Sequence, residues 1–264
     1  MNKQIIIYLG GLLLLFANFA SGQKQHYSTA NGHAHNDYMN VHPFTTAFEN
    51  RFGSIEVDVY PVNGKLLVAH DRHKVDPLKT IDNMYLHPLA EKLITDSFLN
   101  IKLLVDIKEG YKESLTLLME SLRPIINYLS VPGKQNRITI LISGRRPPPS
   151  EYELYPSYIF FDDDLRLPHD PQQWNRVGQV SLQFSRYSTW NGQNNMKHEE
   201  KQRLLQVIDS VHLAGKTIRF WGAPDIRNSW ECQVELGVDL IGTDRIEELS
   251  AYLRMLLKAF ASHR

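Results

Sequence analysis

Two carboxylates stand two residues apart in a segment that otherwise reads as a buried strand. In SIEVDVY, Glu56 and Asp58 alternate with Ile55, Val57 and Val59. Successive side chains of a strand point to opposite faces, so one face is apolar and branched while the other is acidic. If the apolar face packs against helices, both carboxylates point into the interior of the fold. Such a pair is costly to desolvate unless a positive group joins it.

A second segment repeats this pattern. In LLVDIK, Asp106 and Lys108 share one strand face, and apolar residues occupy the other. Carboxylate oxygens from neighbouring strands suit Mg²⁺ or Ca²⁺ better than Zn²⁺, which favours nitrogen or sulfur ligands. We therefore predict a divalent metal site at Glu56, Asp58 and Asp106. The alternative is a salt-bridged interior in which Lys108 neutralises the acids without a metal.

Histidines stand near these acids at two places along the chain. His33 follows a glycine in NGHAHNDY, and His70 lies in VAHD. An imidazole titrates near neutral pH and can act as a general acid or a general base. A cation and Lys108 would neutralise a phosphate oxygen, while the two histidines would exchange protons with the attacking and leaving oxygens. This set of side chains predicts phosphoryl chemistry.

Apolar strand-like runs alternate with helical ones along the chain, and this order sets the fold. Eight runs are predicted as strands: Ala30 to His33, Ser54 to Tyr60, Ile101 to Ile107, Arg137 to Ser143, Tyr158 to Phe161, Gln179 to Phe184, Thr217 to Trp221 and Asp239 to Gly242. Strands that alternate with helices pair in parallel through right-handed crossovers. Eight such units at this length predict an α/β TIM barrel, a (β/α)8 fold, with an open doubly wound sheet as the alternative.

The segments between the strands give further expectations. Helical apolar spacing predicts long helices at Tyr111 to Leu129, His198 to Ala214 and Ile246 to Ala261, and shorter ones at Pro43 to Asn50 and Asn228 to Leu236. Asn63-Gly64 is a hairpin turn that folds Lys65 to Ala69 back beside the second strand. The Pro-rich loop from Arg145 to Pro156 is long enough to cover one end of the barrel.

The N-terminal segment differs from the rest of the chain. Lys3 is followed by the apolar run IIIYLGGLLLLF, shorter than a membrane-spanning helix needs, and then by small residues up to Gly22. We predict that residues 1–22 are a secretory signal peptide, which leaves a single domain over residues 23–264 with no stable membrane span. The expected location is secreted or periplasmic. An uncleaved membrane anchor is the alternative.

Composition limits the choice of partner. The 264 residues include 29 Lys and Arg and 29 Asp and Glu, so the formal net charge is zero. This balance gives no electrostatic case for binding nucleic acid or an anionic membrane surface. Cys232 is the single cysteine, so the core must hold the fold without an internal disulfide. The expected partner is a small molecule, a phosphodiester or a phospholipid.

The order of these motifs resembles the glycerophosphodiester phosphodiesterase and phosphatidylinositol-specific phospholipase C superfamily. The matching motifs are Gly-His at His33, Glu-x-Asp at Glu56 and Asp58, His-Asp at His70, Asp-x-Lys at Asp106 and Lys108, and GVDLIGTDR from Gly237 to Arg245. The resemblance implies that His33 and His70 are the acid–base pair and that Lys108 contacts the phosphate. It places Trp221 at an aromatic position that lines the substrate pocket, although Trp221 could equally be a barrel-core aromatic.

Some motifs depart from the usual pattern of these phosphodiesterases. His33-Ala34-His35-Asn36 replaces the usual His-Arg-Gly, and the third metal ligand is Asp106 where these enzymes often have Glu. Both features are closer to the sphingomyelinase D branch. A glycerophosphodiester, an inositol phospholipid and a sphingolipid are therefore all open as substrates. A hydroxyl beside the phosphate could also act as the attacking group and release a cyclic phosphate.

Two other classes of protein remain as alternatives. His33 and His35 match the His-x-His of amidohydrolase barrels, and Asp244 matches their closing aspartate. That class uses a metal-bound water on amides or esters, and it needs histidines that end the fifth and sixth strands, where this chain has FFDDD and LQFSRYS. The second alternative is a catalytically silent barrel that binds phosphate. Because residues two apart on a strand share a face, His35 could also enter the barrel, but His33 follows glycine as the histidine of the superfamily does.

Overall fold

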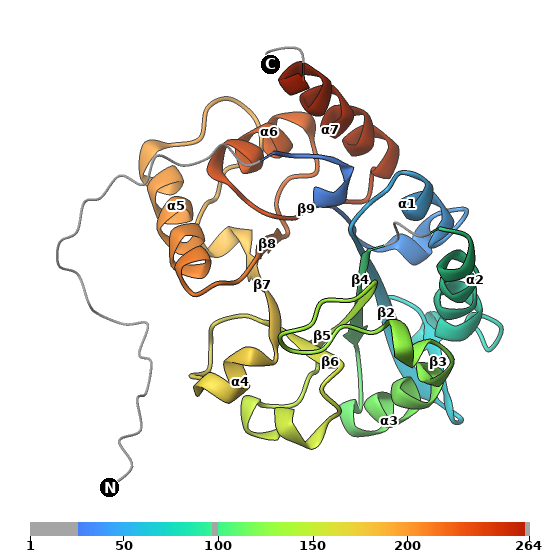
Figure 1. The fold of residues 1–264 in the computed structure, drawn as a ribbon. Helices are drawn as coiled ribbons and strands as arrows, with labels where there is room; N and C mark the ends of the chain where they lie inside the picture. The colour runs from blue at the N-terminus through green and yellow to red at the C-terminus, as the bar shows by residue number, and fades with distance from the viewer. Residues whose placement is uncertain (1–25, 97–99, 262–264) are drawn as a thin grey trace, which may run out of the picture.

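The computed structural model describes residues 26–96 and 100–261, in which parallel strands form a barrel with the helices around it (Figure 1). Its strands are β1 (Gly32–Ala34), β2 (Ser54–Val62), β4 (Ile101–Ile107), β5 (Ile138–Gly144), β6 (Ile159–Asp163), β7 (Val177–Gln183), β8 (Ile218–Trp221) and β9 (Ile241–Thr243). The strand order is β8-β7-β6-β5-β4-β2-β1-β9, and a parallel bridge from Arg219 to Leu240 connects the two ends. The predicted TIM barrel is confirmed, and the strand ends differ by one or two residues from those expected.

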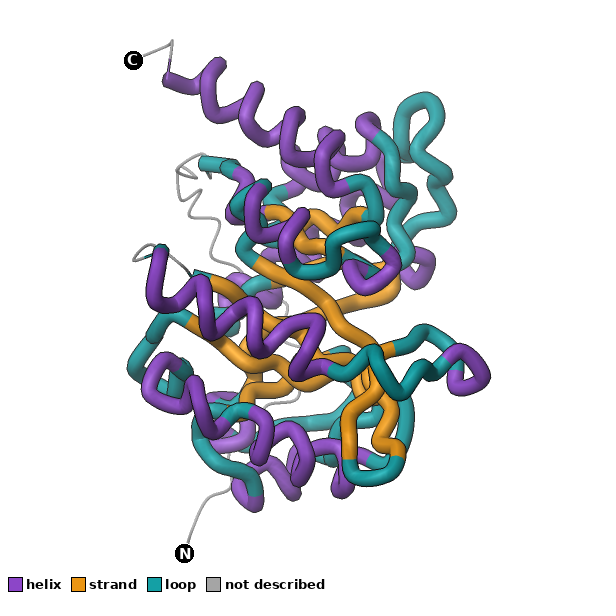
Figure 2. Tube along the Cα trace, turned by 90° about the vertical axis from the view of Figure 1, so that its right-hand side faces the viewer, coloured by secondary structure: helices purple, strands orange, loops and turns teal. Residues whose placement is uncertain are grey.

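Alternation along the strands gives the barrel two apolar layers. The larger layer lies between strands and helices and includes Ile55 and Val57, which are fully buried. A smaller cluster of Leu104, Leu141 and Phe160 comes from positions that alternate with the outward ones, so it fills part of the barrel interior. In the side view of Figure 2 the strands cross the middle of the molecule and the helices lie outside them.

A hairpin extends the second strand. β3 (Lys65–Val68) pairs antiparallel with β2, and Asn63 and Gly64 both have positive φ, at 48° and 74°. Left-handed φ at both central positions is the geometry of the predicted Asn-Gly hairpin turn. The returning chain places the backbone N–H of Ala69 3.3 Å from the carbonyl oxygen of Asp58. The next residue, His70, therefore lies beside the end of β2.

The helices follow the predicted order with three differences. They are α1 (Thr45–Glu49), α2 (His87–Thr95), α3 (Tyr111–Ser121), α4 (Pro171–Asn175), α5 (His198–Leu213), α6 (Arg227–Leu236) and α7 (Ile246–Ala261). The predicted helix from Tyr111 to Leu129 is wrong in its second half, because Pro124 lacks a backbone N–H and the chain continues as the 3₁₀ segment Arg123–Tyr128. Helices α2 and α4 were not predicted.

The Pro-rich segment takes a different course from the one expected. It contains the 3₁₀ segment Pro149–Leu154, and the ring of Tyr152 stacks on Phe161 with centroids 3.7 Å apart. Phe161 belongs to the outer apolar layer, so the 3₁₀ part of the segment packs against the side of the barrel, and only its start, at Arg146, reaches the carboxyl end of the strands. It occupies the place where a crossover helix would pack.

Arg176 holds this crossover together. Its guanidinium is buried and donates hydrogen bonds to the carbonyl oxygens of Tyr152 at 2.8 Å, Pro156 at 2.7 Å and Ile159 at 2.7 Å. Buried carbonyls that lose their donors are left unsatisfied, at a cost of about 1 to 3 kcal/mol each. One planar side chain thus joins three carbonyls of this crossover, two of which, those of Tyr152 and Pro156, also accept a backbone N–H.

We predict that Arg176→Lys lowers the free energy of unfolding by about 3 kcal/mol, because an ammonium cannot reach all the carbonyls that the planar guanidinium spans. Urea unfolding at equilibrium measures the change. Arg203→Lys is the matched control, since Arg203 is exposed and donates one bond, to the carbonyl oxygen of Tyr187 at 3.0 Å. Equal losses in the two variants would contradict the role assigned to Arg176.

Candidate active site

A cavity of about 450 Å³ lies among the carboxyl ends of the barrel strands, the usual place for an active site in this fold. Its lining includes every site residue predicted from the sequence except His33, namely Glu56, Asp58, His70, Asp106, Lys108 and Trp221. The cavity therefore brings together side chains that are far apart in the chain. His35 lines it as well.

The three predicted metal ligands come together because of the strand register. In the pairing of β2 with β4, Asp58 stands directly opposite Asp106. Glu56, Asp58 and Asp106 each offer an oxygen within 4.8 Å of the others, and no second such group occurs among the described residues. The Oδ1 atoms of Asp58 and Asp106 are buried without a hydrogen-bond partner. Because buried polar atoms are nearly always paired, these free oxygens fit a hard cation, and the cluster could hold a metal ion.

Lys108 offsets part of the repulsion between these carboxylates. Its Nζ lies 2.8 Å from Oδ2 of Asp58 and 2.6 Å from Oδ2 of Asp106. Burial opposes the charge on Lys108, but the charges and hydrogen bonds of Asp106 and Asp58 outweigh it and raise the pKa of Lys108. Burial, with the like charge of Asp106, raises the pKa of Asp58 in spite of Lys108. The salt bridges expected for an interior neutralised by Lys108 without a metal are therefore present. They use the Oδ2 atoms of Asp58 and Asp106, so the Oδ1 atom of each aspartate is left for a cation.

Glu56 has a cation of its own that was not predicted. Arg219 of β8 places Nη1 2.9 Å from Glu56 Oε2, and its Nε donates to the Ser181 hydroxyl at 3.1 Å. Burial works against ionisation of Glu56, but Arg219 and the hydrogen bond from His33 hold the pKa of Glu56 well below its usual range. Both partners use Oε2, which leaves Oε1 for the cavity.

His33 belongs to the barrel interior and does not line the cavity. Its side chain is fully buried, with Nδ1 2.8 Å from the Ser54 hydroxyl and Nε2 2.9 Å from Glu56 Oε2. Arg219 Nη1 also contacts Nε2. Burial and the charge of Arg219 lower the pKa of His33 to about 4. Both ring nitrogens are thus engaged by protein groups, and neither is presented to a substrate.

His35 lines the cavity just beyond the end of β1. It follows the last residue of β1, and its backbone N–H is tied to the carbonyl oxygen of Thr243 at 3.0 Å. Its Nδ1 lies 2.8 Å from Asp244 Oδ1. Burial alone would lower the pKa of His35, but the hydrogen bond to Asp244 and the negative charges of Glu56 and Asp244 together outweigh burial and raise it. Nδ1 also lies 3.0 Å from the amide Nδ2 of Asn36. A carboxylate only accepts hydrogen bonds, so the shorter contact with Asp244 favours a hydrogen on Nδ1, which leaves Nε2 of the neutral ring to accept a proton.

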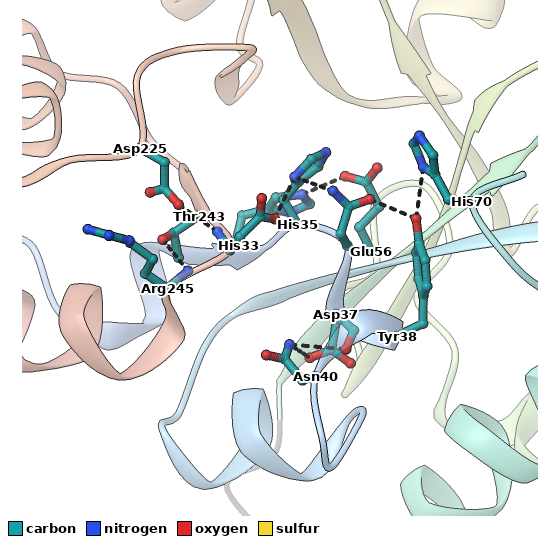
Figure 3. Close-up of polar contacts among 12 residues, drawn as sticks. His33, His35, Asp37, Tyr38, Asn40, Glu56, His70, Asp225, Thr243 and Arg245 are labelled. Atoms are coloured by element: carbon teal, nitrogen blue, oxygen red, sulfur yellow. Dashed lines mark hydrogen bonds and ion pairs between the residues drawn. The ribbon is translucent and has the colours of Figure 1, made fainter.

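His70 reaches the cavity from the hairpin. Its Nδ1 lies 3.2 Å from Asp58 Oδ2 and 3.2 Å from the hydroxyl oxygen of Tyr38. Figure 3 shows this imidazole beside the Tyr38 hydroxyl, with His35 and Glu56 on the β1 side of the cavity. The two histidines therefore approach the cavity from different elements.

The far wall of the cavity carries paired charges and one aromatic side chain. Arg146 lies 3.0 Å from Asp164 and 3.6 Å from Asp163. Asp162 is buried, and burial raises its pKa to about 7. Trp221 ends β8 at the rim with 42% of its surface exposed, so it is not a barrel-core aromatic.

Sequence reasoning missed several residues of the site. Arg219 alternates with apolar neighbours in IRFW just as Asp58 does in β2, so the same inward-facing argument could have found it. Asp162 in FFDDD gave a similar signal. Tyr38 gave none, because its direction depends on the turn at Asn36, which has a left-handed φ of 47°.

Gly144, the last residue of β5, leaves room for Asp106. It stands one residue beyond the position opposite Asp106, with a φ of 68°, and a Cβ at this position would collide with Asp106 Oδ1. Gly64 also has a positive φ, 74°, but a Cβ there would meet nothing within 4 Å. Alanine at either position would therefore strain the backbone, but only alanine at Gly144 would also crowd the site. Comparing the two substitutions distinguishes these two costs in stability.

The comparisons with known proteins agree with this fold and motif order. The family model of the AIM6-like phosphodiesterase domain matches residues 24–98, which include Glu56, Asp58 and His70 but neither Asp106 nor Lys108. A glycerophosphodiester phosphodiesterase from Parabacteroides distasonis has the same fold, with a TM-score of 0.54 and 16% identity over 86% of this chain and 95% of that one. The resemblance to this phosphodiesterase superfamily is therefore confirmed.

Three curated relatives resemble most of the chain. The Altered inheritance of mitochondria protein 6 of Eremothecium gossypii is 25% identical over 83% of this chain and 68% of its own length. The homolog from Arthroderma benhamiae is 22% identical over 83% of this chain and 82% of its own length. The protein from Zygosaccharomyces rouxii is 25% identical over 81% and 67%.

The names of these relatives contradict the expected secreted or periplasmic location. They refer to the inheritance of mitochondria and not to an exported protein. The predicted signal peptide, residues 1–22, lies outside the described residues. Among the helices that the structure does describe, none is long and apolar enough to cross a membrane. The prediction of a secreted or periplasmic location is therefore corrected and withdrawn.

We predict that Gly144→Ala destabilises the fold more than Gly64→Ala does. Both variants place alanine at a left-handed φ, which costs about 1 kcal/mol. Only Gly144→Ala also crowds Asp106, and such overpacking costs about 1 to 3 kcal/mol more. Urea unfolding in metal-free buffer measures both. Equal losses would mean that Asp106 does not occupy the space beside Gly144.

Proposed function

We propose that the chain is a metal-dependent phosphoric diester hydrolase that acts on a glycerophosphodiester or a phospholipid-type substrate. Glu56, Asp58 and Asp106 would hold Mg²⁺ or Ca²⁺. The cation would draw charge from a phosphate oxygen and so make the phosphorus easier to attack. The observation that carries the proposal is the pair of orphaned aspartate oxygens in a cavity that two histidines, from different elements, also line.

The charge of the cluster formed by Glu56, Asp58 and Asp106 with Lys108 and Arg219 favours a phosphodiester. Three carboxylates face two cations, Lys108 and Arg219, which leaves about one negative charge. A divalent cation would turn this into one positive charge, and a phosphodiester carries one negative charge. On the far wall, Arg146 and Arg166 offset the charges of Asp163 and Asp164, and burial raises the pKa of Asp162 to about 7. A phosphomonoester, with up to two negative charges, would leave the site with an excess.

Two histidines can divide the proton transfers. His35 Nε2 would take the proton of the attacking oxygen while that oxygen forms its bond to phosphorus. His70, protonated on both nitrogens, would give its Nε2 proton to the leaving oxygen as the second phosphorus–oxygen bond breaks. Asp244 would orient His35 and stabilise its charged form. Lys108 would contact a phosphate oxygen, and Trp221 would pack against the alcohol part of the substrate.

His35 replaces His33 in this scheme for a geometric reason. The nitrogens of His33 are bound to Ser54 and Glu56, whereas Nε2 of His35 has no partner among the described residues. The same arrangement weighs against an amidohydrolase, since His33 and His35 do not present a pair of ligands to one cavity. A silent phosphate-binding barrel differs from the enzyme only in turnover. An attacking hydroxyl within the substrate would release a cyclic phosphate, which product analysis detects.

We predict that Asp58→Asn weakens binding of Mg²⁺ or Ca²⁺ and removes the effect of metal on melting. In the wild type a hundredfold excess of cation over its Kd adds about 2.7 kcal/mol of stability, so the melting temperature falls on chelation. Titration calorimetry and thermal unfolding with and without chelator measure both effects. Asp82→Asn is the control, because Asp82 bonds to Ser121 outside the cavity. Metal affinity unchanged in Asp58→Asn would leave the salt-bridged interior as the better interpretation.

We predict that His35→Ala and His70→Ala each lower kcat by about 10² to 10⁴, with metal binding preserved. The measurement is turnover of an aryl phosphodiester at saturating metal. His33→Gln should mainly lower the free energy of unfolding, because it disturbs a buried network without touching substrate. An active His35→Ala beside a folded but inactive His33→Gln would return the base to His33. No turnover by the wild type, with cation binding intact, would favour the silent barrel.

A further inference from the structure

The hydroxyl of Tyr38 lies between three polar groups of the site. Its oxygen is 2.7 Å from Asp58 Oδ2, 2.7 Å from Asn36 Oδ1 and 3.2 Å from His70 Nδ1. The ring itself is buried, with 8% of the residue exposed. Figure 3 shows the hydroxyl directed at His70 from below, so that this one atom links a proposed metal ligand to a proposed acid.

The hydrogen atoms around Tyr38 can be counted. A phenol has one hydrogen to donate, and two oxygen acceptors, on Asp58 and Asn36, already compete for it. His70 Nδ1 faces the Tyr38 oxygen and Asp58 Oδ2, both at 3.2 Å. If Nδ1 lacked a hydrogen, it would face two acceptors: the Asp58 carboxylate and the Tyr38 oxygen, whose own hydrogen goes to Asp58 or Asn36. The hydrogen of neutral His70 is therefore assigned to Nδ1, which leaves Nε2 as the nitrogen available to the cavity.

Little else holds the His70 ring. Its side chain is 56% exposed, and its ring nitrogens have no other hydrogen-bond partner among the described residues. An exposed imidazole turns freely and favours the Nε2–H form in water. Without a partner that fixes Nδ1, such a ring would present either nitrogen to the cavity.

We infer that Tyr38 is a positioning residue that keeps the hydrogen of neutral His70 on Nδ1 and thereby directs Nε2 into the cavity. The kinetic consequence rests on the proposed function, in which His70 gives up its Nε2 proton and is left in this Nδ1–H form. The tautomer itself does not depend on any reaction. Tyr38 touches no reacting atom, so its effect passes through His70 and Asp58.

The tautomer is tested without substrate. Long-range ¹H–¹⁵N spectra of histidine-labelled protein at about pH 8.5, well above the ordinary histidine pKa, distinguish Nδ1–H from Nε2–H rings. A His70→Gln sample assigns the His70 signals by their loss. We expect Nδ1–H for His70 in the wild type and a shift towards Nε2–H in Tyr38→Phe. An Nε2–H ring in the wild type would overturn the inference even if the variant failed to fold.

The kinetic arm uses Tyr38→Phe at saturating Mg²⁺ with an aryl phosphodiester. We expect kcat to fall about 10- to 100-fold with KM within about twofold, the usual loss when a residue that orients a ligand or acid is removed. Tyr27→Phe is the matched control, because Tyr27 is also buried and donates one bond, to the carbonyl oxygen of Val238 at 2.8 Å, away from the cavity. The control should change neither kcat nor the His70 tautomer.

The two arms separate the inference from the proposed function. An unchanged tautomer in Tyr38→Phe would overturn the inference, whether or not kcat falls, because Tyr38 would then act only through Asp58. A shifted tautomer with unchanged kcat in an active enzyme would also overturn it. If the wild type turns over no diester, the proposed function fails, while the spectra still decide what Tyr38 does to His70.

Discussion

Repulsion between carboxylates inside the barrel is the constraint on which the rest of the site depends. The neighbouring cations are placed so that they reduce this repulsion. The parallel register of β2 and β4 sets Asp58 against Asp106, and Glu56 stands on the same inward face. Each acid has a cation on one of its oxygens, from Lys108 or Arg219, so no carboxylate is buried without compensation. The compensation is incomplete, since oxygens of both aspartates remain unpaired. Because these oxygens lack a positive partner, the cavity is suited to bind a cation, and a bound cation would in turn attract an anionic substrate.

The barrel could be predicted from the sequence because its strands are short apolar runs separated by turn residues and helical segments. Inward and outward faces followed from alternation alone, which placed Asp58 and Asp106 correctly at the cavity. The predicted helix from Tyr111 to Leu129 was too long, because apolar spacing outweighed the break at Pro124. Arg219 was within reach of the same argument, since a charged residue between apolar neighbours on a barrel strand must point inward.

Side-chain alternation could not predict which of His33 and His35 lines the cavity. Alternation puts both on one face of an extended strand, but β1 ends at Ala34 and Asn36 adopts a left-handed conformation. His33 therefore keeps its strand direction and is enclosed by the interior, while His35 stands at the point where the chain leaves the barrel. Loop direction depends on tertiary contacts, which the local pattern does not encode.

Those contacts lie outside the cavity. Asp37 is fully buried and accepts hydrogen bonds from the backbone N–H of Phe44 and from the hydroxyl of Tyr85 at 3.0 Å, so it fixes the loop that carries His35 and Tyr38. The inward positions at the carboxyl end hold charged side chains and add little apolar packing. Stability must therefore come from the outer apolar layer and from such loop anchors. This division allows the cavity to keep unpaired carboxylate oxygens, because the elements that position its side chains are held by groups that the site does not use.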